Sequence, residues 1–184
     1  MSKITGNALL QDKRFIMDNY GQEEYERFLN LLSEETRKLL KGPILTGTMY
    51  DNKYEGEVMD TFHKTYGDDA LKELAYFKAL SQLKGFYGLV VRFLSIEKVL
   101  NKASQMFSKY FSEGEVIINQ ADKEYVKITI KHPDLSDGEK EFFLYYCQAI
   151  GEKVLQKKIR GKKVIKDDTT TELSYNVTAI TKRI

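Results

Sequence analysis

The chain has 184 residues, of which 42% are hydrophobic and 30% charged, and its formal net charge is +2. These values fit one globular domain, residues 1–184, with enough apolar side chains for a substantial core, and so small a net charge indicates no class of partner. The single cysteine, Cys147, excludes an internal disulfide bond and a cysteine-based zinc or iron–sulfur site. Because we find no signal peptide and no run of about 18 apolar residues, we expect a cytoplasmic protein without a transmembrane segment.

Apolar residues at helical spacing predict a run of helices in the first part of the chain. Ser33 and Ser95 stand where an N-cap side chain would accept a hydrogen bond, and Gly21 and Gly67 stand where a helix would end. Residues 44–51 lack helical spacing, so we expect an extended connector there. The predicted helices cover residues 6–20, 23–32, 34–41, 54–66 and 96–111, with a longer one at 69–94.

The helix predicted at residues 69–94 is strongly apolar, so it should lie at the centre of the domain. One of its faces is polar or small instead, and two glycines on that face would let another backbone approach closely. We expect this face to pack against another helix or a second subunit, and we therefore expect a homodimer. The face comprises Lys78, Ser81, Gln82, Gly85, Gly88 and Arg92.

From Gly114 onward the apolar period changes from that of a helix to that of a strand. Two hairpins are predicted, with a helix at residues 139–159 between them that Gly161 ends. The predicted fold class is α+β. A bundle of about five to six helices in residues 1–112 is followed in residues 113–184 by ββ-α-ββ with a four-stranded antiparallel sheet. The predicted strands are residues 116–119, 125–131, 163–166 and 173–179.

This element order, together with three segments of the sequence, resembles one ligand-binding superfamily. The superfamily comprises heme nitric-oxide/oxygen-binding (H-NOX) domains, vinyl-4-reductase domains and the small subunits of the TRAPP vesicle-tethering complex, and the chain looks most similar to a bacterial branch. The resemblance extends over nearly the whole chain and implies a ligand-binding domain with a role in signalling. The segments are GNALLQDKRFIMDNYGQEEYERFLNLL, ILTGTMYDNKYEGEVMDTF and FLSIEKVLNKASQMF.

The residues that hold cofactors in this superfamily have no counterparts here. The resemblance places the heme-ligating histidine in the helix before the first hairpin, here residues 96–111, which contain no histidine. The Tyr-x-Ser-x-Arg signature of the heme-binding branch is absent from residues 135–144. One cysteine cannot reproduce the metal-binding cluster of the vinyl-4-reductase branch, and Cys147 falls in a different helix from the acylated cysteine of the TRAPP branch. We therefore expect no metal and no cofactor, heme included.

Aromatic residues from several predicted elements should converge in this fold. Most of them fit a plain core, but some could line a pocket for a small apolar or planar ligand, at the place that heme occupies in the resembling branch. The pocket candidates are Phe77, Phe86, Tyr87, Val90, Phe107, Phe142, Phe143 and Tyr146.

One stretch departs from the even distribution of charge, because residues 153–166 contain seven cations and no acid. Cations at the end of a helix and on an edge strand have a structural explanation, since they stabilise the helix terminus and hinder aggregation. The alternative is a surface for an acidic partner, and the absence of interleaved aromatic residues argues against nucleic acid. This basic patch comprises Lys153, Lys157, Lys158, Arg160, Lys162, Lys163 and Lys166.

The two histidines and the cysteine do not form a catalytic arrangement in the sequence. His63 and His132 are interpreted as surface or boundary residues rather than ligands, and Cys147, among apolar neighbours, is interpreted as a buried inert thiol. No nucleophile, base and orienting group can be assembled, and no glycine-rich phosphate loop is present. We therefore expect no catalytic residues and no enzyme.

Three functions remain open after this reading. The first is a non-enzymatic regulatory or interaction domain, working as a homodimer, that binds a small apolar ligand or a protein partner. The second is a sensor that takes heme or another tetrapyrrole through His63 or a tyrosine. The third is a metal-dependent enzyme of the reductase-like branch.

Overall fold

A computed structural model describes residues 2–83, 110–121 and 124–178, together with residues 98, 105, 107 and 108. The fold is α+β, as predicted, with helices first and then ββ-α-ββ. Its main sheet has four antiparallel strands in the order β3-β4-β6-β5. The elements are β1 (Lys3–Thr5), α1 (Gly6–Tyr20), α2 (Gln22–Leu31), α3 (Glu34–Lys41), β2 (Met49–Asp51), α4 (Asn52–Gln82), β3 (Glu115–Ala121), β4 (Tyr125–Lys131), α7 (Asp137–Leu155), β5 (Lys158–Asp167) and β6 (Thr170–Thr178).

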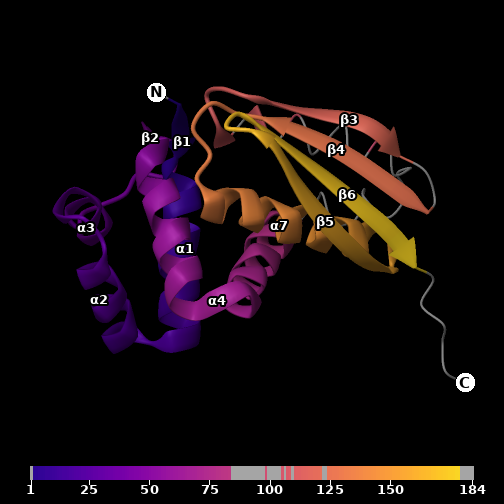
Figure 1. Cartoon of the computed structure of the whole chain (residues 1–184). Coiled ribbons are helices and arrows are strands. Elements are labelled where there is room, and N and C mark those ends of the chain that lie inside the picture. Colours follow the sequence, from indigo (N-terminus) through magenta and orange to yellow (C-terminus); the bar gives the residue numbers. More distant parts are fainter. Residues whose placement is uncertain are drawn as a thin grey trace, which may run out of the picture.

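Local signals explain where most of these helices begin and end. The Ser33 hydroxyl accepts a hydrogen bond from the backbone N–H of Thr36 at the start of α3. Ser136 and Glu139 form a capping box at the start of α7. Gly67, predicted as a helix end, has φ +81° and ψ −176° and divides α4 into two helical halves that meet at a sharp bend (Figure 1). The predicted break between residues 54–66 and the central helix is therefore confirmed.

The second half of α4 is the described part of the predicted central helix. Residues 84–94 of that prediction, with Gly85 and Gly88, lie outside the described residues, and so does most of the predicted helix at 96–111.

The four-stranded sheet has one apolar face and one polar face. Val126, Ile128 and Ile130 of β4 are buried, whereas the intervening residues are more exposed. The central pairing joins β4 to β6, with Ile128 opposite Leu173. Figure 1 shows α7 lying along one face of the sheet, with α4 between α7 and α1 to α3. One continuous apolar core connects the helices with this inner face of the sheet.

A small two-stranded sheet, β1 with β2, was not predicted as strands. Ile4 of β1 pairs with Tyr50 in this sheet and also forms a bridge with Phe111. Strands of three residues carry too few positions for an alternating pattern to be recognised in a sequence. Their pairing anchors the first residues of the chain next to the core.

The predicted helix at residues 139–159 is too long at its C-terminal end. The helix ends at Leu155, because Gln156 adopts a left-handed conformation with φ +52°, and β5 begins at Lys158. Gly161 therefore does not end a helix. It lies within β5, where an added Cβ would come within 2.7 Å of Leu144 and 2.8 Å of Tyr175. Ile159 keeps the helical spacing of α7, but it belongs to β5, and its buried side chain faces α7 near Gly151.

Among the described residues, no helix is both long and apolar enough to cross a bilayer.

Candidate functional site

The described residues line a cavity of about 90 Å³ between the start of the chain, α4, α7 and the inner face of the sheet. Ile4 and Ala8 close one side, and β3 and β4 contribute four aliphatic side chains. The wall is predominantly apolar, with a few polar groups gathered on α4 and α7. The lining residues are Ile4, Ala8, Glu55, Lys78, Gln82, Phe107, Tyr110, Phe111, Val116, Ile118, Ile128, Ile130, Glu139, Phe142, Phe143, Tyr146, Cys147 and Ile150.

Four of the eight pocket candidates from the sequence line this cavity, namely Phe107, Phe142, Phe143 and Tyr146. Phe77 lies elsewhere, in the helical core, where its ring centroid is 5.4 Å from that of Phe15. Phe86, Tyr87 and Val90 lie outside the described residues.

The aromatic wall is built from rings that support one another. Phe107 stacks on Phe111 with ring centroids 4.6 Å apart, and Phe143 contacts both rings at 5.7 Å. Phe142 stacks on Tyr146 at 5.6 Å, and the Tyr146 hydroxyl donates a hydrogen bond to the side chain of Gln82. Aromatic pairs at these separations favour particular relative orientations, so each ring helps to position its neighbours along the wall.

A buried ion cluster forms the polar end of the cavity. The Lys78 ammonium lies 2.6 Å from Asp12 Oδ1 and 2.8 Å from Glu55 Oε1. All three side chains are at most 5% exposed. The ammonium also lies 5.1 Å from the centroid of the Phe142 ring, which favours a cation over its face. The cluster joins α1 to both halves of α4.

The bend at Gly67 brings Lys78 and Glu55 together. These residues are 23 positions apart in α4, a separation of about 35 Å along a straight helix at ~1.5 Å per residue. Because the helix turns at Gly67, the two halves lie against each other and the ion pair closes to 2.8 Å.

Burial and the neighbouring charges determine which groups of this cluster are protonated. Asp12 and Glu55 each have one carboxyl oxygen that forms no hydrogen bond with a neutral or cationic group of the described residues. Burial raises the pKa of Asp12 well above its usual value, and the nearby charge of Glu55 and a side-chain hydrogen bond between the two carboxyl groups raise it further. We infer that the two coupled carboxyl groups share one proton, so that a single negative charge faces Lys78 and the cluster is neutral.

Glu139 adds a second buried acid to the polar end. Its carboxyl group accepts hydrogen bonds from the Ser136 backbone N–H at 2.8 Å and from the Asn52 side chain at 3.1 Å. Burial raises the pKa of Glu139 to about 8, against the lowering effect of the hydrogen bond from Ser136, and the charge of Glu55 adds to the rise. Glu139 is therefore mainly protonated at neutral pH.

This protonation predicts a pH dependence of stability. Between the usual pKa of 4.5 and the folded value of about 8, the native protein holds a proton on Glu139 that the unfolded chain does not. The stabilising contribution is therefore complete below about pH 4.5 and is lost as the pH rises to about 8, by up to ~1.4 kcal/mol per pH unit. We expect the stability of the parent chain relative to E139Q to fall between pH 5 and pH 9 in urea unfolding.

E139Q is the appropriate reference for this measurement. Glutamine loses a hydrogen bond that Glu139 makes, but the resulting difference in the free energy of unfolding does not depend on pH. A constant difference between the two proteins across this range would contradict the buried, protonated acid.

Cys147 and His63 occupy the kinds of place that the sequence suggested. Burial raises the pKa of the Cys147 thiol to about 12, despite a hydrogen bond with Tyr175 that lowers it, so a thiolate does not form at neutral pH. The imidazole of His63 is partly exposed, and its Nε2 lies 2.6 Å from Asp68 Oδ1. Asp60, three residues before His63 in α4, accepts a hydrogen bond from the Gly138 backbone N–H.

The interpretation of His132 as a surface residue is wrong, since this side chain is only 1% exposed. Its Nδ1 accepts a hydrogen bond from the Asp134 backbone N–H at 3.2 Å, which places the proton on Nε2. The ring is edge-on to Phe111, with centroids 5.1 Å apart, and burial lowers the pKa of His132. From the sequence, His132 could only be placed at the end of a strand. Its burial results from the tertiary packing around that strand end.

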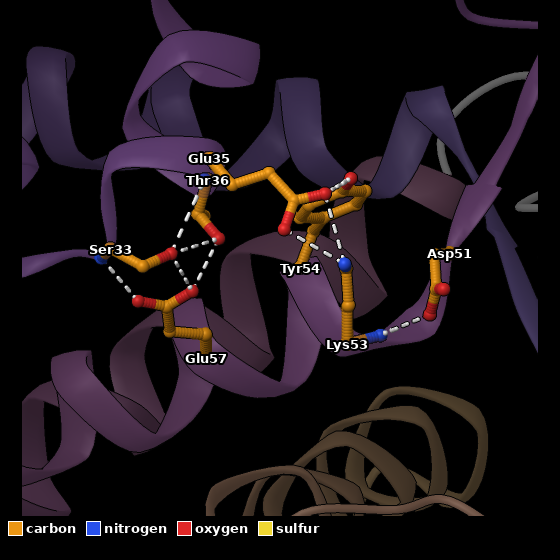
Figure 2. A network of polar contacts seen from close by, with 7 residues as sticks. All are labelled: Ser33, Glu35, Thr36, Asp51, Lys53, Tyr54 and Glu57. Atoms are coloured by element: carbon orange, nitrogen blue, oxygen red, sulfur yellow. Dashed lines mark hydrogen bonds and ion pairs between the residues drawn. The ribbon is translucent and has the colours of Figure 1, made fainter.

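A second polar cluster, at the surface, has a structural explanation. Figure 2 shows the Glu57 carboxylate at the N-terminus of α3, where it accepts hydrogen bonds from the Ser33 backbone at 2.5 Å, from the Ser33 hydroxyl at 2.8 Å and from Thr36. Lys53 points at Glu35, with Nζ 2.8 Å from Oε2. These contacts fasten α3 to the first turns of α4. Because each charge faces a partner inside the cluster, no ligand is needed to satisfy it.

The residues of the ion cluster were not recognised as a site from the sequence. Asp12 and Glu55 read as ordinary polar positions of amphipathic helices. Lys78 and Gln82, four residues apart in an otherwise apolar helix, were the available signal, and we interpreted them as part of a packing face. That face does contact another helix, because Gln82 is bonded to Tyr146 of α7. Among the described residues, no group of three or more histidine, cysteine or acidic side chains is arranged to hold a metal ion.

Comparison with known proteins gives matches only at the level of structure. No family model and no curated protein matches the chain. The Fe(II) unliganded H-NOX protein from K. algicida superposes with a TM-score of 0.70 over 98% of this chain and 100% of that chain, at 11% identity. A point mutant of the H-NOX protein from T. Tengcongensis superposes with a TM-score of 0.60 over 97% and 100% of the two chains, at 12% identity.

Proposed function

Because the chain has the H-NOX fold over nearly its whole length, we propose that it is a non-enzymatic regulatory domain that binds a small, uncharged and mainly apolar molecule in the cavity. The observation that carries this proposal is the cavity itself, whose wall is apolar and whose ion cluster is internally balanced. Its occupancy would shift the packing of α4 on α7 and so transmit a signal.

The dimensions and charge of the cavity support this ligand class. An engineered apolar cavity of about 150 Å³ in another protein binds benzene, so about 90 Å³ suits a molecule of benzene size or smaller. Lys78 has its charge offset by Glu55, and Glu139 is mainly protonated at neutral pH. A charged ligand would have no free counter-charge at this wall and would lose its hydration on entry.

Heme is the alternative that the structural neighbours suggest, since one of them is an Fe(II) H-NOX protein and another belongs to work on heme distortion in that family. The described residues do not fit it. Their cavity, about 90 Å³, is well below the ~300–1,000 Å³ of common cofactor sites. No histidine lines it among the described residues, and His63 lies outside it. The two tyrosines that line it already have partners, since the Tyr110 hydroxyl accepts a hydrogen bond from Asn7 and the Tyr146 hydroxyl donates one to Gln82. Absence of a Soret band after incubation with excess heme would agree with our proposal, and a stoichiometric band would contradict it.

The reductase-like alternative and the homodimer remain separate predictions. Elemental analysis of the purified protein tests the first, because a metal-dependent enzyme must carry its metal. Light scattering at high concentration tests the second, and a monomeric mass would contradict the dimer.

The cavity can be tested with benzene as the probe and A8L as the variant that fills the space. Ala8 lines the cavity, so a leucine there should occupy the volume that benzene needs. At ten times its Kd, a ligand that binds only the folded state stabilises it by about 1.4 kcal/mol. We expect benzene to stabilise the parent chain and not A8L in urea unfolding.

The matched control is A75L. Ala75 is fully buried in the helical core away from the cavity, so this substitution should cost ~1–3 kcal/mol through overpacking but leave the benzene effect intact. Native mass spectrometry of protein from its own host, with an absorption spectrum of the same sample, would then identify the natural ligand by its mass. A parent chain that benzene does not stabilise, and that carries no added mass, would refute the proposed function.

A further inference from the structure

Strand β5 presents a row of cations at an edge of the sheet. Lys158, Arg160 and Lys162, here called the β5 cation row, are exposed and occupy alternate positions, so their side chains share one face. The opposite face of the strand holds the buried Ile159, which fixes the row on the outer face of the sheet. In the strand order β3-β4-β6-β5, β5 stands at one end and, among the described residues, pairs with β6 alone.

No ion pair joins the row to an acid in the part of the chain that the structure describes, and Glu172, on the same face of β6, pairs with Lys127 and Lys166. Arg160 and Lys162 lie opposite Asn176 and Ser174 of β6, neither of which is charged. Two other members of the basic patch are already used. Lys163 Nζ lies 2.6 Å from Glu141 on the inner face, and Lys166 Nζ lies 3.7 Å from Glu172.

The backbone of the same strand is also open. Between residues 160 and 166, the described hydrogen bonds of the β5 backbone all belong to the ladder with β6. Just before this stretch, the Ile159 N–H donates to Glu152 Oε1 at 3.0 Å. The side chain of Ile165, near the end of the strand, is 47% exposed. The edge therefore offers hydrogen-bonding groups, a row of positive charge and one apolar side chain.

We propose that the β5 edge binds an acidic segment of a partner protein, which adds to the sheet as a further strand with Asp or Glu at alternate positions facing the β5 cation row. Successive side chains on one face of a strand are ~6.6–6.8 Å apart in any β-strand, so cations and carboxylates on neighbouring strands match along their whole length. Main-chain hydrogen bonds supply affinity in this mode of recognition, and the alternate side chains supply specificity.

Two simpler explanations of the β5 edge leave some of its features unexplained. Lysines on an edge strand hinder aggregation by themselves, but that role does not explain an exposed isoleucine on the same edge. Single-stranded nucleic acid would need aromatic platforms beside the cations, and the neighbours of the row on β6 are Ser174 and Asn176. A strand in which acidic residues alternate with apolar ones would engage the open backbone of β5, the β5 cation row and Ile165 together.

The test is fluorescence anisotropy with a labelled peptide in which Glu and Val alternate. We expect the parent chain to bind it, and K158E/R160E/K162E to bind at least tenfold more weakly. K3E/K38E/K64E is the matched control, because it makes the same change in net charge at exposed lysines of the helical part and should bind like the parent. Hydrogen exchange should slow at the amides of β5 when the peptide is bound.

Other results would overturn the proposal. A peptide of the same composition with its glutamates in one block should bind weakly, and equal binding would show attraction by charge alone without an added strand. Tighter binding of a short oligothymidylate than of the alternating peptide would assign the row to nucleic acid. If K158E/R160E/K162E bound the alternating peptide with unchanged affinity, the row would have no part in recognition. None of these outcomes bears on the cavity, which the benzene experiment tests separately.

Discussion

We expect K78M to destabilise the protein by about 3–5 kcal/mol, because it removes the cation from a buried ion pair and leaves the acids uncompensated. Lys78 is 4% exposed and holds both Asp12 and Glu55, so water cannot take over its role. Chemical unfolding at pH 7, followed by circular dichroism, measures the loss. The deficit should shrink as the pH falls toward 5, because the carboxylate that K78M leaves without its cation can then take up a proton.

The matched variant replaces the whole cluster, as D12L/E55M/K78M. Replacing a buried ion cluster with apolar side chains of similar volume is often neutral or stabilising. We therefore expect the triple variant to recover most of the stability that K78M loses, which also covers the case in which K78M does not fold. If K78M unfolds within ~1 kcal/mol of the parent, the cluster is not the buried, balanced group described above.

G138A should destabilise the protein by about 3 kcal/mol or more, since overpacking against backbone leaves no flexible group to yield. Gly138 lies in the first turn of α7, where an added Cβ would come within 2.6 Å of the Met59 carbonyl carbon and 2.7 Å of the Asp60 nitrogen in α4. Its N–H donates to Asp60 Oδ1 at 2.7 Å, and this contact would be disturbed as well. Because α4 and α7 form two walls of the cavity, the same change should weaken benzene binding.

Two other glycines separate this effect from a general intolerance of alanine. Gly151 is also in α7, but its Cβ would meet only the tip of the Ile159 side chain, which can rotate, and helix propensity favours alanine by about 1 kcal/mol. Gly47 has open space around the position of a Cβ. We expect G151A and G47A to lie within ~1 kcal/mol of the parent in urea unfolding. A similar loss in all three would contradict the close approach of α7 to α4 as the cause.

The buried ion cluster and the β5 cation row differ in whether their charges are paired within the domain. Inside, Lys78 is surrounded by its own counter-charges, so the cavity is left for an uncharged ligand. Outside, the β5 cation row keeps its charge without acids beside it among the described residues. In the two proposals the ligand binds at the inner face of the sheet and the partner at its β5 edge, so a coupling between them would pass through the β-strands.

The sequence by itself determined the elements whose signals are local. Ser33 and Gly67 mark a helix start and a helix break because capping and positive φ depend on the residue itself and its nearest neighbours. The alternation in β4 predicted a strand with one buried face for the same reason. The resemblance to the H-NOX superfamily, drawn from element order, gave the fold that the solved structures now support.

Only the tertiary structure decided which distant residues meet. Asp12 and Lys78 are 66 positions apart, and no period in the sequence links them. The burial of His132 depends on the rings of Phe107 and Phe111, which belong to another part of the chain. The helical spacing that reached Ile159 did not extend the helix, because Gln156 ends α7 in a left-handed conformation and Ile159 pairs with β6 as part of β5. Contacts of this kind depend on how whole elements pack, and the cavity and its ion cluster consist of such contacts.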